Sequence, residues 1–216
     1  METTPQGDPF AGSALPTLAY FSALGKFISI FAHLEKMAFM FLGRVVGVHY
    51  HVAQATFGGS PRVKDCVDRI NRCLTLYCLT PDVPQHILNL KKDWDQLHPQ
   101  IGTINTTRNE ILHYGYQKDE SGNQFVTNEH LQYIESKVTR FPISADRLDA
   151  MCGDLSKILF LLNHHFYYLN QKTPPYQPSI YEEAINTPWQ YKHGVLNPQP
   201  NKSPKKTQKQ PRRPRS

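Results

Sequence analysis

Residues 87–113 read ILNLKKDWDQLHPQIGTINTTRNEILH, and the spacing of their apolar side chains decides the fold. An apolar residue recurs every three or four positions, as on one face of an α-helix: Ile87, Leu90, Trp94, Leu97, Ile101 and Ile104. The next position in the series is Arg108. A buried arginine keeps its charge and needs an anion nearby. We expect a carboxylate of this chain, a carboxylate of a second chain or a bound phosphate.

Proline and short polar residues interrupt this helical pattern. Pro99 is expected to break or kink the helix, which divides it into about 84–97 and 100–113. Asn109 and His113 share one helix face, whereas Arg108 and His113 lie about 140° apart on an ideal helix. They can address one site if the helix loosens near His113, if the arginine reaches round, or if a dimer brings two copies together.

Apolar spacing predicts helices in most of the remaining chain. The other expected helices cover about 17–43, 60–79, 128–138 and 145–170, and 43–59 shows a mixed pattern. The first is apolar over much of its surface, as in the centre of a bundle. Two short apolar segments around a Ser-Gly turn predict a β-hairpin at about 114–127. Ser60-Pro61 and Ser144 are expected to begin helices. We therefore predict an all-α bundle of about four to five main helices.

The composition divides the chain into four regions. Residues 1–15 are expected to form a disordered N-terminus, 16–172 the helical bundle, 173–200 a proline-rich extension and 201–216 a basic disordered tail. Aromatic residues of the extension are expected to lie on the bundle. The tail holds seven of the 24 basic residues, which leaves 17 basic and 18 acidic residues elsewhere. The net charge of +6 therefore belongs to the tail and does not indicate a general nucleic-acid-binding face on the domain.

Cysteine spacing and the apolar first helix indicate the cellular setting. The four cysteines, Cys66, Cys73, Cys78 and Cys152, form no CxxC pair, and we expect reduced thiols and a cytoplasmic protein. The first ten residues show no signal-peptide pattern. Charged side chains such as Lys26 and Glu35 interrupt residues 18–42, so no membrane span is predicted.

Most catalytic and metal-binding patterns are missing from the sequence. It contains no GxSxG, Walker, GxGxxG or HExxH motif. His49-Tyr50-His51 has alternating histidines but no third ligand at short spacing. We therefore predict no cofactor and no metal site.

Arg108-Asn109, followed by His113, resembles the R-x4–6-H signature of the HEPN superfamily of small helical proteins. The resemblance covers about residues 18–170. It implies a helical fold and, in members with an intact motif, a metal-independent endoribonuclease that acts as a toxin or in phage defence. Other members are non-catalytic binding modules.

The resemblance also implies roles for single residues. His113 would be the general base or acid, Arg108 would clamp the phosphate, and Asn109 would position them, with a 2′,3′-cyclic phosphate as product. Histidine titrates near neutrality and arginine donates in a plane that matches phosphate. One chain supplies one such histidine, so a homodimer with the motif at its interface is expected. Glu35 is a candidate for the polar first-helix residue that faces the motif in many members.

The tyrosines after the motif depart from the toxin branch whose antitoxin partner is a nucleotidyltransferase. That branch carries Arg-x4-His-x-Tyr, but here Gly115 stands at the tyrosine position, between Tyr114 and Tyr116. That regulation is therefore not carried over, although an antitoxin protein stays among the partners that the resemblance implies. The two tyrosines would stack on a base or pack within the hairpin.

Two other functions are consistent with the same residues. In one, the protein is a non-catalytic helical module that binds a protein or nucleotide, and Arg108 pairs with Glu35 or Asp154 inside the fold. In the other, the basic tail 201–216 binds RNA or anionic lipid without specificity. The nuclease and the non-catalytic module differ in whether the polar motif lines an open cleft or a sealed core.

Overall fold

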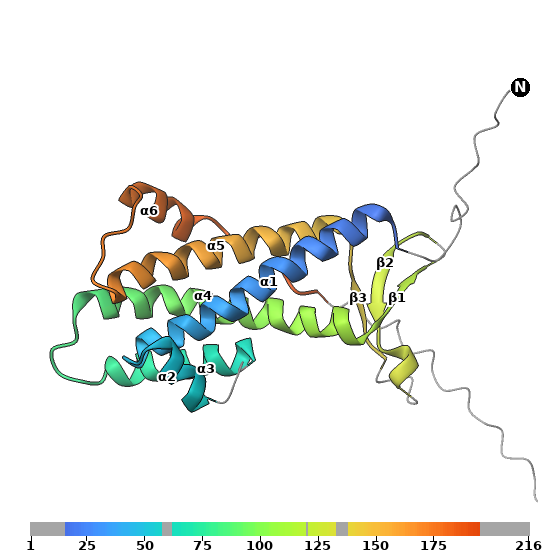
Figure 1. Ribbon diagram of the computed structural model, residues 1–216. Coiled ribbons are helices and arrows are strands. Elements are labelled where there is room, and N and C mark those ends of the chain that lie inside the picture. Colours follow the sequence, from blue (N-terminus) through green and yellow to red (C-terminus); the bar gives the residue numbers. More distant parts are fainter. Residues whose placement is uncertain (1–15, 58–61, 120, 133–137, 195–216) are drawn as a thin grey trace, which may run out of the picture.

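The computed structural model describes residues 16–57, 62–119, 121–132 and 138–194. The predicted terminal regions 1–15 and 201–216 lie outside this part, as do the Ser60-Pro61 helix start and residues 133–137. The described chain is mostly helical, with six α-helices and one three-stranded antiparallel sheet (Figure 1). The prediction of a largely helical protein is confirmed.

Most of the helices and strands lie close to the predicted ranges. The helices are α1 (Leu18–Val45), α2 (Tyr50–Phe57), α3 (Val63–Tyr77), α4 (Gln85–His113), α5 (Ala145–Leu169) and α6 (Pro178–Asn186). The strands are β1 (Gly115–Lys118), β2 (Gln124–Thr127) and β3 (Arg140–Pro142). Ser144 begins α5 as predicted, because its hydroxyl accepts a hydrogen bond from the Arg147 amide at 3.3 Å. The sequence pattern missed α2, β3 and α6.

α4 is one continuous helix of 29 residues, so the predicted break at Pro99 is wrong. Proline removes one helical hydrogen bond and costs about 3 kcal/mol in a helix interior. The buried side chains on either side, Leu97 and Ile101, each contribute about 2 kcal/mol and offset that cost. α4 also stays helical to His113, so the first alternative, a loosened helix near His113, is not what the structure shows. The Thr103 and Thr107 hydroxyls donate to the carbonyls of Pro99 and Thr103, within the helix itself.

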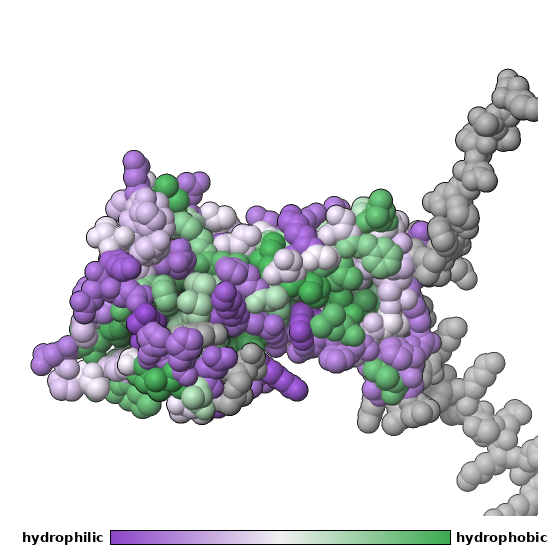
Figure 2. Space-filling model, in the orientation of Figure 1, coloured by the Kyte–Doolittle hydropathy of each residue, from purple (hydrophilic) through white to green (hydrophobic). Residues whose placement is uncertain are grey.

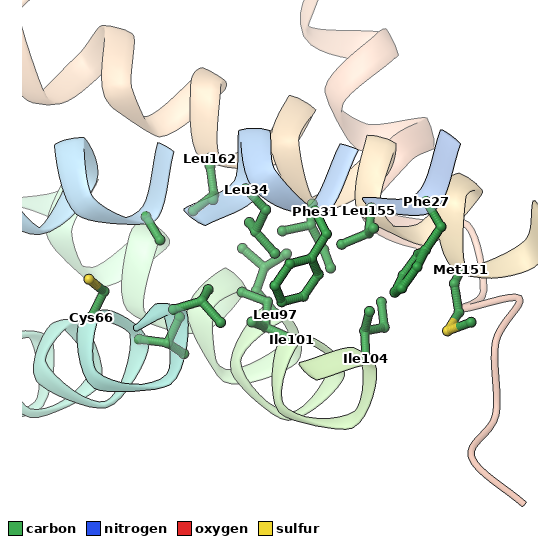
Figure 3. Packing of buried hydrophobic residues seen from close by; sticks show 14 of the residues in the cluster. Phe27, Phe31, Leu34, Cys66, Leu97, Ile101, Ile104, Met151, Leu155 and Leu162 are labelled. Carbon is green, nitrogen blue, oxygen red and sulfur yellow. The ribbon is translucent and has the colours of Figure 1, made fainter. Parts of the chain in front are cut away.

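The core lies where α1 crosses the other long helices. α1 packs against α5 and α3, α3 packs against α4, and α4 packs against α5. In Figure 3, Phe31 and Leu34 of α1 point between Ile101 of α4 and Leu155 of α5, and all four side chains are buried. Cys66 of α3 joins this core, and burial raises the pKa of its thiol to about 11. All four cysteines are free thiols.

The sheet lies at the end of the long helices where α4 finishes (Figure 1). β2 is its central strand and pairs antiparallel with β1, as the hairpin prediction requires, and also with β3. Phe141 and Pro142, which the sequence pattern assigned to no helix or strand, belong to β3. Of the helix expected at 128–138, the structure shows one 3-10 turn at Glu129–Leu131. The Asn128 side-chain oxygen instead accepts a hydrogen bond from the Thr139 backbone amide at 2.7 Å, just before the start of β3.

After α6, residues 187–194 form an extended segment, here called the strap, that crosses α5 and α4. The buried carboxylate of Asp154 accepts hydrogen bonds from the backbone amides of Gln190 and Tyr191, each at 2.9 Å. It also accepts a hydrogen bond from the side-chain amide of Gln100 at 2.8 Å. The Lys157 ammonium lies 3.9 Å from the Trp189 ring centre. The strap is thus fixed on the helices by a buried acid and by aromatic contacts.

Candidate functional site

The motif residues lie on the last two turns of α4. The guanidinium of Arg108 lies over the Phe31 ring of α1, 5.3 Å from its centre, and Nη1 donates to Asn109 Oδ1 at 3.0 Å. Its Nε is buried and has no hydrogen-bond partner within the described residues. The helix stays regular to His113, so Arg108 approaches the Asn109 face by reaching round the helix.

The two carboxylates expected to pair with Arg108 lie elsewhere. Asp154 is occupied by the strap and Gln100, and Glu35 is half-buried close to Cys66, where its charge contributes to the raised pKa of that thiol. Among residues 16–57, 62–119, 121–132 and 138–194, no carboxylate forms an ion pair with Arg108. The anion that the sequence requires for this arginine is therefore not supplied by the described chain.

A groove of about 520 Å³ runs between α3 and the second half of α4. Asn109 and His113 both line it, together with Glu110 of the same two turns and Tyr114. Arg108 is not part of the lining, but its hydrogen bond to Asn109 places the guanidinium next to it. The structure thus brings the amide and the imidazole together, with the arginine behind the amide.

The other end of the groove carries polar residues that the sequence analysis did not single out. Asp68 of α3 and His98 of α4 form a hydrogen-bonded pair at 3.2 Å, and Lys64 of α3 lines the same groove. His98 lies fifteen residues before His113, which is about 22 Å along a helix. The two histidines are therefore too far apart to act on one phosphodiester.

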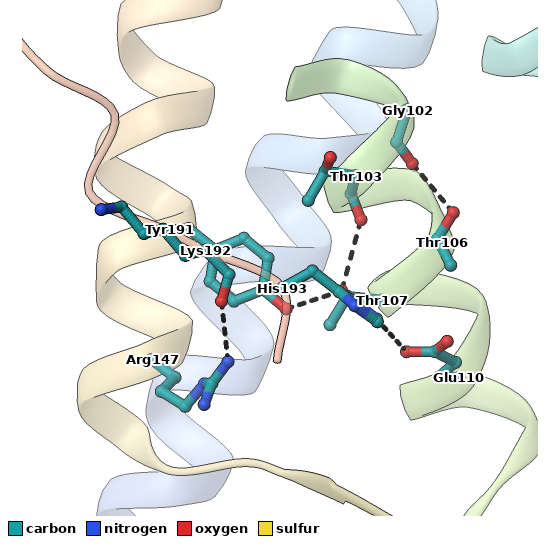
Figure 4. Close-up of polar contacts among 9 residues, drawn as sticks. All are labelled: Gly102, Thr103, Thr106, Thr107, Glu110, Arg147, Tyr191, Lys192 and His193. Carbon is teal, nitrogen blue, oxygen red and sulfur yellow. Dashed lines mark hydrogen bonds and ion pairs between the residues drawn. The ribbon is translucent and has the colours of Figure 1, made fainter. Parts of the chain in front are cut away.

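Glu110 connects the groove to the strap (Figure 4). His193 of the strap lies with Nε2 3.2 Å from Glu110 Oε2. Burial raises the pKa of the Glu110 carboxyl, and the hydrogen bond and charge of His193 act in the opposite direction. No spacing in the sequence joins residues 110 and 193, so sequence patterns alone could not have paired them.

The two tyrosines after the motif have different surroundings. Tyr114 lines the groove and stacks against Phe141 of β3, with ring centres 6.0 Å apart. Tyr116 packs on Tyr20 of α1, and burial raises the pKa of its hydroxyl. Tyr114 is thus placed to contact a ligand in the groove, whereas Tyr116 packs within the fold.

A second polar cluster lies away from the groove, where α6 covers α5. His165 Nε2 lies 2.9 Å from the Asp93 carboxylate and 3.3 Å from the Tyr181 hydroxyl. His164 stacks on the Tyr181 ring and hydrogen-bonds to Tyr176, and burial lowers its pKa to about 4. These side chains satisfy one another and attach α6 to the long helices.

Neither a metal-binding cluster nor a helix that could span a membrane occurs among the residues that the structure describes. Within the described residues, no three histidine, cysteine or acidic side chains come together as a metal site, and His49 and His51 are both exposed. None of the helices in this part of the chain has the length and apolar character needed to cross a membrane. The candidate site consists of the Arg108 guanidinium, the Asn109 amide, the His113 imidazole and the Glu110 carboxyl group beside one groove.

Comparison with known proteins adds no relative to this description. No family model matches the sequence, and neither a curated protein nor a solved structure matches it. The residues of the groove are thus the basis for assigning a function.

Proposed function

We propose that this chain is a metal-independent endoribonuclease of the HEPN type, with its helices arranged as a bundle. It would act in the cytoplasm as a toxin or phage-defence effector, on RNA and without a cofactor. One observation carries the proposal: Asn109 and His113 line a groove, and beside them Arg108 has no carboxylate partner within the described chain. An arginine so placed is suited to a phosphate.

The chemistry follows from the side chains. Cleavage of RNA requires a base for the 2′-hydroxyl, positive charge near the phosphorus, and an acid for the departing 5′-oxygen. His113 takes one of the two proton-transfer roles. Arg108 neutralises the charge that develops on the phosphate, and Asn109 holds the guanidinium in position through its hydrogen bond. The products are a 2′,3′-cyclic phosphate and a 5′-hydroxyl.

A non-catalytic binding module is the second candidate, and an exposed apolar surface favours it. Phe21 of α1 and Leu112 of α4 are 54% and 47% exposed. Figure 2 shows hydrophobic side chains gathered where α1 and α4 run toward the sheet. Leu112 lies one helical turn from Arg108, so a protein that covers it would also reach the motif. A second copy of this chain fits that position in the nuclease proposal, and an antitoxin or other protein fits it in the module proposal.

The groove separates the two candidates. A structural role for the motif calls for a sealed core in which Arg108 has a carboxylate partner. Instead His113 is exposed, Asn109 is half-buried, and both face the groove. This arrangement supports the nuclease.

The test is digestion of a mixed RNA pool by the purified protein in EDTA. Wild type is expected to leave cyclic phosphate ends, and His113→Ala is expected to lower the rate at least 100-fold, since a general acid or base contributes about that much. His86→Ala is the matched control, because His86 is an exposed histidine on the first turn of the same helix. Cleavage by His113→Ala at the wild-type rate would refute the nuclease proposal.

A further inference from the structure

The proposed reaction needs two proton-transfer groups, and His113 is one. The resemblance supplies the second from a partner subunit. His98, the other histidine of the groove, is about 22 Å away along α4 and cannot take that role. The groove near His113 contains one further titratable side chain that can exchange a proton at mild pH, Glu110.

We propose that Glu110 is the second acid–base residue of the site, so that one chain holds the complete proton-transfer pair with His113. The assignment rests on the proposed ribonuclease function. Residues three apart on a helix have Cβ atoms about 5–6 Å apart, which suits two groups that act on the 2′- and 5′-oxygens of one phosphodiester. Both side chains line the same groove.

The surroundings of Glu110 suit a proton-transfer group. Only 11% of its side chain is exposed, so its carboxyl is largely removed from water. One oxygen, Oε2, is held by His193 of the strap at 3.2 Å, while Oε1 makes no hydrogen bond with a described residue. The carboxyl is therefore oriented from one side and has an oxygen available for a substrate hydroxyl. Burial also raises its pKa, which makes the carboxylate a stronger base.

The charges around this carboxyl come from several elements. His193 faces it from the strap, and Arg108 and His113 lie within three residues on α4. Lys64 and Asp68 line the groove from α3, farther toward the His98 end. His193 is the group that lowers the pKa of Glu110, but burial outweighs it, so the pKa stays above its ordinary value.

The reaction step is balanced with these two residues alone. The Glu110 carboxylate takes the proton of the 2′-hydroxyl, and the 2′-oxygen forms its bond to phosphorus. The bond between phosphorus and the 5′-oxygen breaks, and His113, as imidazolium, gives that oxygen a proton. Glu110 ends protonated and His113 neutral, and proton exchange with water restores both. Arg108 faces the negative charge on the phosphate throughout.

The experiment measures cleavage of a fluorescent single-stranded RNA of mixed sequence in EDTA, from pH 4 to 9. Glu110→Gln is expected to lower kcat at least 100-fold and to remove the acidic limb of the pH profile. Glu182→Gln, an exposed glutamate on α6, is the matched control and should behave as wild type. If Glu110→Gln fails to fold by circular dichroism, Glu110→Ala with added formate replaces it, and formate is expected to restore activity.

Mixing variants tests whether the pair lies in one chain. Equimolar Glu110→Gln and His113→Ala should stay inactive, because neither chain then holds both groups. Recovery of about a quarter of the wild-type rate would show a site shared between subunits and would overturn the assignment.

Failure of this assignment can be told apart from failure of the proposed function. If His113→Ala is inactive but Glu110→Gln or Glu110→Ala cleaves at the wild-type rate, only the role of Glu110 is refuted. An inactive Glu110→Ala that formate does not restore also refutes only that role. If wild type does not cleave, or if His113→Ala cleaves normally, the ribonuclease function and the role of Glu110 fall together.

Discussion

Replacing Asp154 with alanine tests how the C-terminal strap is held. Asp154 is 1% exposed, and its carboxylate accepts three hydrogen bonds. Two come from the backbone amides of Gln190 and Tyr191 and one from the Gln100 side chain. A backbone amide in an extended segment cannot turn to another acceptor without moving the chain. The alanine variant therefore either leaves buried donors unpaired or releases the strap.

The magnitude follows from these contacts. A hydrogen bond to a charged acceptor contributes about 1.5 kcal/mol, so three contribute about 4 to 5 kcal/mol. Removing the charge also removes the cost of burying it, which returns part of that amount. We expect a net loss of about 3 kcal/mol in the free energy of unfolding. For a chain of this length that corresponds to a fall in Tm of about 10 °C.

Urea denaturation followed by circular dichroism measures this loss directly. The control is Asp149→Ala, on the same helix, whose carboxylate is exposed and pairs with exposed Lys26 at 3.1 Å. Such exposed pairs add little to stability, because water and salt screen their charges. If Asp154→Ala and Asp149→Ala unfold at the same urea concentration, the buried carboxylate does not hold the strap and the reasoning is refuted.

Two further substitutions test a buried guanidinium and a buried imidazole. Arg108→Ala should cost only about 1 kcal/mol in urea denaturation, because it loses the contact with the Phe31 ring and the hydrogen bond to Asn109 but no ion pair; a loss above 3 kcal/mol would reveal a buried partner. His164 has a pKa of about 4 in the folded state and of 6.5 in the unfolded state. Below pH 6.5 the unfolded state therefore binds more protons, and the protein becomes less stable as the pH is lowered. Wild type should lose about 2 kcal/mol between pH 7 and 5 from this residue, and His164→Phe should lose less; equal losses would contradict the burial of the imidazole.

The long helices were predictable because their signals are local. Ser144 and the apolar spacing after it mark α5 within a residue at each end. The same spacing predicts α4, but the low helix propensity of Pro99 predicts a break, because a propensity describes one residue in isolation. The packing of Leu97 and Ile101 against other helices outweighs it, and that packing is not visible in the local sequence.

The features that the sequence did not predict depend on partners far along the chain. β3 contains only three residues and becomes a strand because β2 pairs with it. The expected pairing of Arg108 with Glu35 or Asp154 was chosen by residue type, and the strap takes Asp154 first. No local sequence pattern points to Glu110, because its hydrogen-bond partner, His193, lies 83 residues later.

The direct passage from α4 into the sheet restricts how this chain can change in length. Only Tyr114 separates the end of α4 at His113 from the start of β1 at Gly115. Strand pairing fixes where Gly115 lies, so one residue inserted between Asn109 and Gly115 would turn the preceding helical face by about 100°. Insertions and deletions should therefore be tolerated between β1 and β2, around the exposed turn at Gly122, and eliminated by selection between Asn109 and Gly115.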